Sequence, residues 1–355
     1  MRYDTLQIVQ RLSPGGIEML ALRLAQTLPG RNAIVSLEGS PEQLCADWPA
    51  AAASNVDLFA LGKAPGVSPA ALSDLTRLLR RLAPRCVFTH HIGPLLYGGS
   101  AARLAGVPTL VHVEHDVWHH RQPRRRLQLR LARLALRPIF AAISPDAATT
   151  LGYATGARSV VVIPNGVDLG VFKAGGRDAA RARLGLPSGT PVIGCVGRLE
   201  PVKNQAALLH ALPRLDARVH AVLVGDGSQA APLRALAAEL GLAERVHFAG
   251  HRDDVPALYP AFDVLCLPSQ QEGLPFVVVE AQACGIPVVA TEVGAVRDAL
   301  CPATSRLVPP GDVAALARAL DDALRQPARE SPRDFVTRFF DWDATVRRYT
   351  ILAKG

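Results

Sequence analysis

The sequence predicts an α/β protein built from two doubly wound, Rossmann-like domains with a cleft between them. The chain has 355 residues, which is too long for one ordinary core and fits two domains of roughly 150 residues each. Apolar residues make up 49% of the chain and charged residues 20%, so each half can bury a core. Short apolar runs alternate with helix-like stretches at a spacing of roughly 20 to 30 residues, as in parallel sheets covered by helices.

The second half carries the clearer series. Runs that are apolar throughout are typical of parallel strands covered on both faces. They read PVIGCVG, HAVLVG, RVHFAG, FDVLCLP and IPVVAT, at residues 191–197, 220–225, 245–250, 262–268 and 286–291.

The first half repeats this alternation less regularly, with strand-like TLQIVQ, NAIVSLE, PRCVFTH and PTLVHVEH. A polar, glycine-containing piece, KAGGRDAARARLG, is the best candidate for a linker. We therefore place the first domain at residues 1–172, the linker at 173–188 and the second domain at 189–335.

The composition excludes several classes of protein. No stretch approaches the ~20 apolar residues of a membrane-spanning helix, and MRYDTLQIVQ reads as a first strand and not as a signal peptide. The six cysteines include no CxxC pair, so we expect reduced, buried thiols without a metal or disulfide framework. We expect a cytoplasmic protein, at most peripheral on the inner face of the cytoplasmic membrane.

In doubly wound sheets, ligands bind at the carboxyl ends of the strands. Gly15 and Gly16 follow the first strand and precede a helix, where backbone N–H groups can approach a phosphate. An ordinary tight turn explains the same pair equally well. Arg198 and Lys203 share one loop after a strand and can converge on a single diphosphate, although two solvated surface charges would look the same.

Two glutamates flank the apolar run in PSQQEGLPFVVVEAQACGIPVVAT, residues 268–291. Pro275 suits a first helical turn and Gly285 a helix stop, which predicts a helix over 276–284. Glu272 lies in the loop before this helix and Glu280 lies inside it.

Eight residues at ~1.5 Å rise separate these carboxylates by up to ~12 Å. That exceeds the ~5 to 9.5 Å of a glycosidase pair. We expect Glu272 and Glu280 to hold opposite ends of one elongated ligand, with the backbone amides of Gly273 and Leu274 between them. The alternative is a glutamate that complements the helix dipole and a second, incidental one.

Two further patterns leave alternatives open. VGDGSQA, residues 224–230, matches G-x-G-x-x-A and hints at a dinucleotide site, but it follows the second strand of its domain and its acid, Glu244, lies outside any strand end. Histidines gather between residues 90 and 120, and His115 stands at the carboxyl end of a strand. They show no HExxH pattern, which argues against zinc. The histidines are His90, His91, His112, His115, His119 and His120.

Together these loops resemble the retaining GT-B glycosyltransferases, most closely the glycosyltransferase family 4 type. The resemblance covers nearly the whole chain and includes SPGGIE, VHVEHD, VIPNGVD, VGRLEPVKNQ, LVGDG, FAGHRDDVPALY and the E-x7-E pattern from Glu272 to Glu280. One departure is EVGAVRDAL, where Ala295 replaces a glycine and Asp298 is the acid that follows.

The resemblance implies a role for each candidate residue. Arg198 and Lys203 would bind the donor diphosphate, Gly15 and Gly16 would approach the same phosphates, and His115 would lie near the reacting carbon of the sugar. Glu272 would meet sugar hydroxyls and Glu280 the ribose hydroxyls. Catalytic roles fall to His115, Glu272, Arg198 and Lys203, and donor binding to Gly15, Gly16, Arg198, Lys203, Glu272, Gly273, Leu274, Pro275 and Glu280.

The resemblance also implies a reaction. A hexosyltransferase of polysaccharide biosynthesis would move a sugar from a nucleotide-sugar to a polysaccharide, oligosaccharide or lipid-linked acceptor, with retention of configuration and without a metal or other cofactor. Residues 336–355 would form a closing helix that crosses back to the first domain. A nucleotide-sugar epimerase on the same scaffold, an NAD-binding oxidoreductase and a sugar-nucleotide binding protein without turnover are the alternatives.

The formal charge of +8 is concentrated in one segment, Arg121–Arg137, which holds seven arginines. Within it the arginines at 126, 130, 133 and 137 fall on one helical face and the leucines at 127, 131 and 134 on another. A basic amphipathic helix indicates contact with anionic lipid head groups or a lipid-diphosphate acceptor. A solvated surface helix whose leucines pack on the domain is the alternative. Nucleic acid is not an expected partner, because no aromatics interleave with the arginines.

Overall fold

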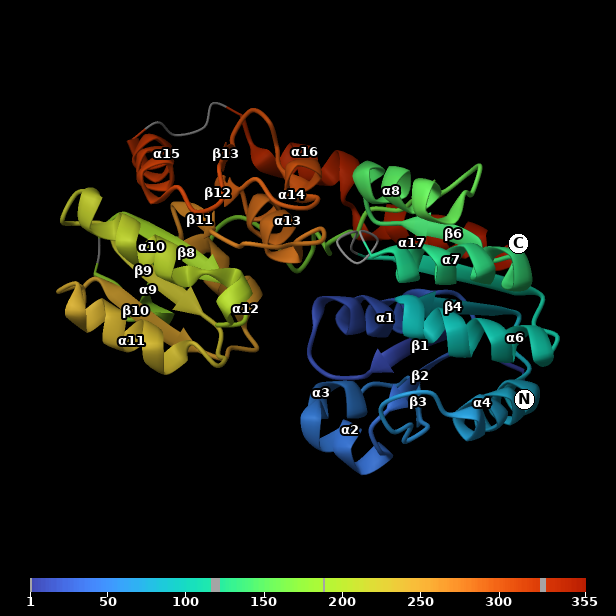
Figure 1. The fold of residues 1–355 in the computed structure, drawn as a ribbon. Coiled ribbons are helices and arrows are strands. Elements are labelled where there is room, and N and C mark those ends of the chain that lie inside the picture. Colours follow the sequence, from blue (N-terminus) through green and yellow to red (C-terminus); the bar gives the residue numbers. More distant parts are fainter. Residues whose placement is uncertain (1, 116–121, 188, 326–329) are drawn as a thin grey trace. The chain divides into compact units, whose positions relative to one another are not determined.

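The computed structural model describes residues 2–115, 122–187, 189–325 and 330–355, apart from the side chain of Cys45 (Figure 1). The chain divides into two compact units. The first comprises Met1–Asn165 with Asp343–Gly355, and the second comprises Gly166–Trp342. Each contains one parallel sheet covered by helices, so the predicted α/β class with two Rossmann-like sheets is confirmed.

The sheet of the first unit has seven parallel strands in the order β3-β2-β1-β4-β5-β6-β7. Most of these strands are buried along their length, because helices cover both faces. The strands are β1 (Thr5–Arg11), β2 (Asn32–Glu38), β3 (Asp57–Ala60), β4 (Cys86–His90), β5 (Thr109–Glu114), β6 (Ile139–Ala142) and β7 (Val161–Val162).

Two long helices of the first unit, which follow Ser68 and Ser144, begin at a serine cap. Ser68 and Ser144 each accept a hydrogen bond from a backbone N–H of the first turn, and a proline follows each of them. The helices are α1 (Gly16–Thr27), α2 (Pro41–Asp47), α3 (Pro49–Ala52), α4 (Pro69–Leu82), α5 (Ile92–Pro94), the π-helix η1 (Leu95–Gly99), α6 (Ser100–Leu104), α7 (Pro123–Leu136), α8 (Pro145–Thr155) and the C-terminal α17 (Trp342–Lys354).

The second unit contains six parallel strands in the order β10-β9-β8-β11-β12-β13. The five strand-like runs of the second half are all strands, and the sequence prediction missed only the short β13. The strands are β8 (Val192–Val196), β9 (His220–Val224), β10 (Val246–Gly250), β11 (Val264–Leu267), β12 (Val288–Thr291) and β13 (Arg306–Val308).

Helices follow most strands of the second unit and cover its sheet (Figure 1). Buried residues of α10, α11 and α15 pack with β8, β9 and β11 in one apolar cluster. The α-helices are α9 (Arg177–Arg183), α10 (Gln205–Ala211), α11 (Ala230–Glu239), α12 (Val255–Leu258), α13 (Phe276–Ala283), α14 (Val296–Ala299), α15 (Val313–Arg325) and α16 (Pro332–Phe339). The 3₁₀ turns are η3 (Pro201–Lys203), η4 (Leu212–Arg214) and η5 (Tyr259–Ala261).

The division between the units falls after Asn165, seven residues before the predicted end of the first domain. The segment 173–188 was predicted to be a linker, but it contains helix α9, which is anchored in the second unit. Arg181 forms an ion pair with Asp263 at 2.9 Å, and the same carboxylate accepts the backbone N–H of Val192 at 2.7 Å. A run of arginine and alanine looks like a linker in sequence, whereas here its charge is used to dock the helix.

The closing helix α17 packs within the first unit although it follows the second in sequence. The ring of Tyr349 is fully buried and lies 5.6 Å from that of Phe88 on β4. Thr345 donates a hydrogen bond of 3.0 Å to the carbonyl of Pro164. Aromatic packing ties the C-terminal helix to β4, and the hydrogen bond ties it to the segment after β7.

Five cysteines have described side chains, and all five are free and buried. Burial raises the pKa of Cys195 and of Cys284 to about 12 in each case, which keeps these thiols protonated. Within the part of the chain that the structure describes, no helix combines the length and the apolar character needed to cross a membrane.

Candidate functional site

Each sheet reverses its strand order once, between β1 and β4 in the first unit and between β8 and β11 in the second. At such a reversal the connections leave the carboxyl ends of two neighbouring strands in opposite directions, which opens a crevice for ligands. The loop after β8 carries Arg198 and Lys203, and the loop after β11 carries Glu272. The topology therefore brings these sequence-predicted residues to one edge of the second sheet.

Lys203 and Glu272 form an ion pair at this edge. The Nζ atom of Lys203 donates to Oε1 of Glu272 at 2.7 Å, and the hydroxyl of Ser269 donates to the same oxygen at 2.7 Å. The side chain of Glu272 is only 7% exposed, whereas that of Lys203 is 25% exposed. Arg198 lies on the same loop and is exposed. The edge thus presents two cations, one of them held by a nearly buried carboxylate.

The loop after β9 fixes the position of the loop that carries Arg198 and Lys203. The N–H of Leu199 donates to the carbonyl of Asp226, and the N–H of Gln229 donates back to the carbonyl of Leu199. A Cβ atom at Gly225 or Gly227 would overlap the backbone of Gly197 or Leu199. These two glycines are therefore used for close approach of two loops, which explains VGDGSQA without a dinucleotide.

The backbone at Glu272 is fixed by the segment after β12. Gly294 has a φ of +52°, and a Cβ atom there would overlap the carbonyl oxygen of Glu272. Thr291 donates to the carbonyl of Ser269 at 2.5 Å, which secures the start of the same loop. Ala295, the departure from the family pattern, has an ordinary φ of −92°, and its N–H donates to the carbonyl of Gly273 at 3.3 Å. The chain thus retains the one glycine that this contact requires.

Glu280 lies inside α13, and its partner differs from those of Glu272. Its Oε2 atom accepts a hydrogen bond of 2.7 Å from the hydroxyl of Tyr259. Burial, reinforced by the neighbouring carboxylate of Glu280, raises the pKa of Tyr259 well above its usual value, so the phenol remains a donor. The phenol of Tyr259 thus supplies a polar partner to a carboxylate whose helix is otherwise largely apolar. Leu274 and Pro275 are buried at the entrance to α13, which begins at Phe276 as predicted.

Gly15 and Gly16 stand between β1 and α1, as the sequence predicts. Gly15 is the N-terminal flanking residue of α1, and no side chain caps that end of the helix. Its backbone is extended, with φ −166°, so the conformation there does not require glycine. The uncapped N–H groups of the first turn are the feature of this segment that suits an anion.

Four of the clustered histidines lie on β4 and β5 or directly after them. Nδ1 of His90 and Nε2 of His115 share a hydrogen bond of 2.8 Å, and Nε2 of His90 lies 2.9 Å from the amide oxygen of Gln7 on β1. His112 bonds instead to the hydroxyl of Thr89, at 3.1 Å. His119 and His120 lie outside the described residues, as does Asp116. Among the described residues, no group of three or more His, Cys, Asp or Glu side chains is arranged to hold a metal ion.

The backbone at His91 is strained. Its φ of 72° with ψ of 167° lies in a region that is otherwise almost exclusive to glycine, and such strain concentrates at functional sites. Burial, and then the neighbouring His91 and His112, lowers the pKa of His90 to about 3. Burial and then His90 lower the pKa of His115 well below its usual value. Both rings are therefore neutral near pH 7.

The predicted basic helix is α7, and its leucines do not lie where the alternative prediction put them. Leu127, Leu131 and Leu134 are 59%, 56% and 62% exposed. The side chains that pack on the domain are Leu129, Ala132 and Leu136, on the opposite side of the helix. The hypothesis that the three leucines pack on the domain is therefore wrong, because the helix is turned by about half a revolution.

The described arginines of α7 and its C-terminal cap differ in exposure. Arg124, Arg130 and Arg137 are exposed, whereas Arg125, Arg126 and Arg133 are half-buried. The Nε atoms of Arg126 and Arg133 are buried without a hydrogen-bond partner among the described residues. Arg121, the first residue of the predicted basic segment, lies outside the described residues.

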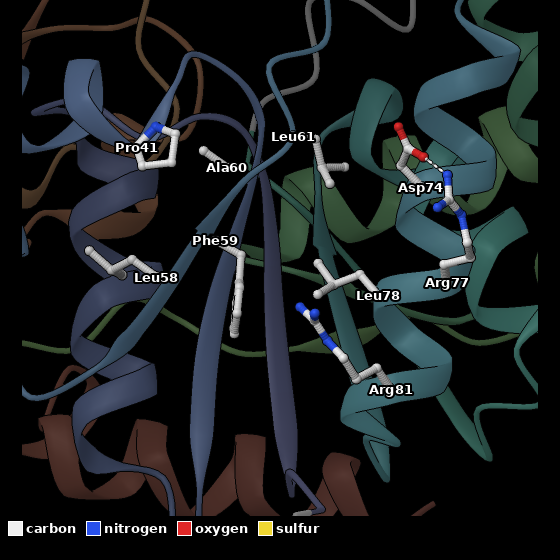
Figure 2. A pocket seen from close by; sticks show the side chains of 9 residues that line it. All are labelled: Pro41, Leu58, Phe59, Ala60, Leu61, Asp74, Arg77, Leu78 and Arg81. Carbon is white, nitrogen blue, oxygen red and sulfur yellow. Dashed lines mark hydrogen bonds and ion pairs between the residues drawn. The ribbon is translucent and has the colours of Figure 1, made fainter.

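A separate hollow of about 420 Å³ lies in the first unit between edge strand β3 and α4. Figure 2 shows Phe59 and Leu78 flanking it, with the guanidinium of Arg81 between them, while Arg77 turns towards Asp74. None of the sequence-predicted site residues lines this hollow.

Comparison with known proteins covers both halves of the chain. A family model described as glycosyl transferases group 1 matches residues 176–339, and one described as glycosyltransferase family 4 matches residues 14–171. The 2-deoxystreptamine glucosyltransferase of Streptomyces kanamyceticus is 37% identical over 282 residues, which are 73% of this chain and 73% of that relative. The chain belongs to the group 1 glycosyltransferases.

Other relatives of this glycosyltransferase match in part. The D-inositol 3-phosphate glycosyltransferase of Mycobacterium sp. (strain KMS) is 46% identical over 178 residues, which are 47% of this chain and 40% of that relative. Among solved structures, Anabaena Alr3699/HepE in complex with UDP-glucose is 26% identical, with a TM-score of 0.80 over 97% of each chain. Its complex with UDP gives 25% identity and a TM-score of 0.82 over 98% of each chain. The predicted GT-B architecture is confirmed.

Sequence reasoning missed several residues that position the candidate side chains. Ser269 and Gly294 support Glu272, Tyr259 supports Glu280, and Gln7 and His90 support His115. The clustered histidines were a visible signal for His90. No local pattern marks Gly294, Tyr259 or Gln7, because each acts across a large separation in sequence, and Ser269, three residues before Glu272, stands in no motif of its own.

Gly294→Ala tests whether the second unit depends on the contact between Gly294 and Glu272. We expect a loss of stability of about 3 kcal/mol or more, with a displaced Glu272 loop, because a Cβ atom there overlaps backbone and not a flexible side chain. Urea unfolding measures the change.

The matched control is Gly241→Ala. Gly241 has a φ of +69° with open space around it, so this variant reports backbone strain alone, at about 1 kcal/mol. Equal losses in the two variants would show that the contact with Glu272 has no special weight.

Proposed function

We propose that this glycosyltransferase moves a hexose from a nucleoside diphosphate donor to a hydroxyl acceptor, with retention of configuration and without a metal. The observation that carries the proposal is the Lys203–Glu272 ion pair at the strand reversal between β8 and β11. It puts a cation suited to phosphate beside a carboxylate suited to sugar hydroxyls. Uridine is the proposed base, because Alr3699/HepE, which covers almost the whole chain, has been solved with UDP and UDP-glucose.

Arg198 and Lys203 bind the donor diphosphate in this proposal. As the bond between the sugar carbon and the phosphate oxygen breaks, its electron pair moves to that oxygen, and the two cations stabilise the added charge. The oxygen of the acceptor hydroxyl bonds to the same carbon, and its proton passes to the leaving phosphate oxygen. Attack on the face from which the phosphate departs retains the configuration.

Glu272 and Glu280 bind the two ends of the donor. Glu272 accepts hydrogen bonds from sugar hydroxyls through Oε2, because Lys203 and Ser269 already occupy Oε1. The amides of Gly273 and Leu274 lie next to it, and Glu280 accepts from the ribose hydroxyls. Gly15 and Gly16 present the uncapped start of α1 to phosphate, and His115 approaches the sugar.

An assay with a panel of donors tests this assignment. Release of nucleotide and labelled product from UDP-, GDP- and ADP-hexoses, with membrane extract as acceptor, distinguishes transfer from epimerisation or binding without turnover. We expect transfer from a UDP-hexose. An excess of EDTA, about 5 mM, should leave the rate of transfer unchanged, because cations of the chain replace a metal at the diphosphate.

In that assay, Lys203→Ala and Glu272→Ala are each expected to lower kcat/KM by about 10²-fold or more, the typical effect of losing one charged contact in the transition state. Lys173→Ala and Glu239→Ala are matched controls, because both residues are exposed and lie in the same unit. A Glu272→Ala protein that transfers sugar at the native rate would refute the site assignment.

We propose that the acceptor is a glycan or a lipid-linked sugar, and that α7 brings the enzyme to an anionic membrane surface. Leu127, Leu131 and Leu134 form an exposed apolar row on α7, opposite its buried face. Arg124 and Arg130 are exposed on either side of this row. An apolar row between cations fits the interface of an anionic bilayer, where the leucines enter the acyl boundary and the arginines meet phosphates.

Vesicle sedimentation tests the membrane surface. We expect the wild type to bind vesicles rich in phosphatidylglycerol and not pure phosphatidylcholine. Changing Leu127, Leu131 and Leu134 together to serine should weaken binding by at least about tenfold, because each leucine contributes about 1 kcal/mol or more when it leaves water.

Two control variants of the first unit keep this test specific. Leu104→Ser removes an exposed leucine of α6, and Arg77→Glu reverses an exposed charge of α4. Both should bind like the wild type. Equal binding by the triple serine variant would contradict the role of α7.

A further inference from the structure

A chain of three buried side chains crosses the strand reversal of the first sheet. The amide oxygen of Gln7 on β1 lies 2.9 Å from Nε2 of His90, at the end of β4. Nδ1 of His90 lies 2.8 Å from Nε2 of His115, which follows β5. Gln7 and His90 are 0% exposed and His115 is 4% exposed, so water does not compete for these bonds.

The direction of these hydrogen bonds fixes the protons. An amide oxygen only accepts, so Nε2 of His90 carries a hydrogen. His90 is neutral in its buried place, so its Nδ1 has a lone pair and no hydrogen, and it accepts from Nε2–H of His115. His115 is neutral too, so its Nδ1 has a lone pair and no hydrogen and can only accept a hydrogen bond.

That last nitrogen has no hydrogen-bond partner among the described residues, although it is buried. An unmet buried acceptor lowers stability, and a hydroxyl group is the simplest ligand that satisfies it. We propose that Gln7 and His90 are positioning residues that hold His115 in the Nε2-protonated tautomer, so that Nδ1 accepts a hydrogen bond from a hydroxyl of the substrate.

The groups around His115 are compatible with this arrangement. The ring of His91 packs against that of His115 at 5.8 Å. A carboxylate oxygen of Glu114 accepts the backbone N–H of His115 at 3.3 Å, which fixes the main chain. We call the hydrogen-bonded residues Gln7, His90 and His115 the relay. His112 forms its hydrogen bond with Thr89 instead, so it is not part of the relay. This inference rests on the proposed function in one respect only, namely that the hydroxyl belongs to a sugar substrate.

The tautomer can be measured without activity. In protein labelled with ¹⁵N-histidine, long-range ¹H–¹⁵N correlation spectra at pH 7.5 report which ring nitrogen carries hydrogen, and His115→Asn and His90→Asn assign the signals. We expect hydrogen on Nε2 of both His90 and His115. Hydrogen on Nδ1 of His115 would overturn the proposal, since Gln7 would then present its amide N–H₂ to His90.

The consequence for catalysis is tested with Gln7→Leu, which removes the terminal acceptor. We expect kcat to fall by about 10- to 100-fold, the usual effect of losing an orienting partner, with little change in donor KM. Thermal unfolding of the variant separates misfolding from loss of orientation.

Thr89→Val is the matched control, because it removes a buried hydrogen bond to a histidine of the same cluster outside the relay. It should retain kcat and the His115 tautomer. A Gln7→Leu protein with native kcat and an unchanged tautomer would refute the relay. A wild type with the expected tautomer but no transfer from any donor would refute the proposed function alone.

Discussion

The reversal of strand order between β8 and β11 is the constraint on which the chemistry of the second unit depends. Because both strands are parallel and adjacent, their following loops begin at the same edge of the sheet. One loop supplies Lys203 and the other supplies Glu272, and their side chains meet at 2.7 Å. Residues 69 positions apart thus form one pair because of topology, without any local sequence pattern joining them.

The pair itself indicates function more than stability. The carboxylate of Glu272 is nearly buried and so loses most of its hydration. The ammonium of Lys203 and the hydroxyl of Ser269 compensate for that loss only in part. Much of the surrounding structure supports this arrangement: Gly294 allows close approach to Glu272, and Gly225 and Gly227 allow two loops to pack back to back. Such backbone requirements at one edge are what a preorganised anion and sugar site needs.

The sequence predicted the fold because short, continuous apolar runs such as VIGCV and VLCL are typical of buried parallel strands and recur at regular spacing along the chain. It also singled out Lys203, Glu272 and Glu280 as candidates, since charged residues in or beside such runs are conspicuous. It could not predict the rotation of α7, because leucines at 127, 131 and 134 satisfy helical spacing as well as those at 129 and 136 do. Nor could it find Gln7, Tyr259 or Gly294, whose roles exist only through contacts across the sheet.

In the proposed site, Lys203 meets the diphosphate and Glu272 meets the sugar of one donor. Calorimetry with UDP and with UDP-glucose measures both contacts in the wild type, in Lys203→Ala and in Glu272→Ala. We expect the Lys203 variant to bind both ligands more weakly, and the Glu272 variant to lose only the extra affinity that the sugar provides. Equal weakening of both ligands by the Glu272 variant, or no weakening by the Lys203 variant, would rule out this division of roles.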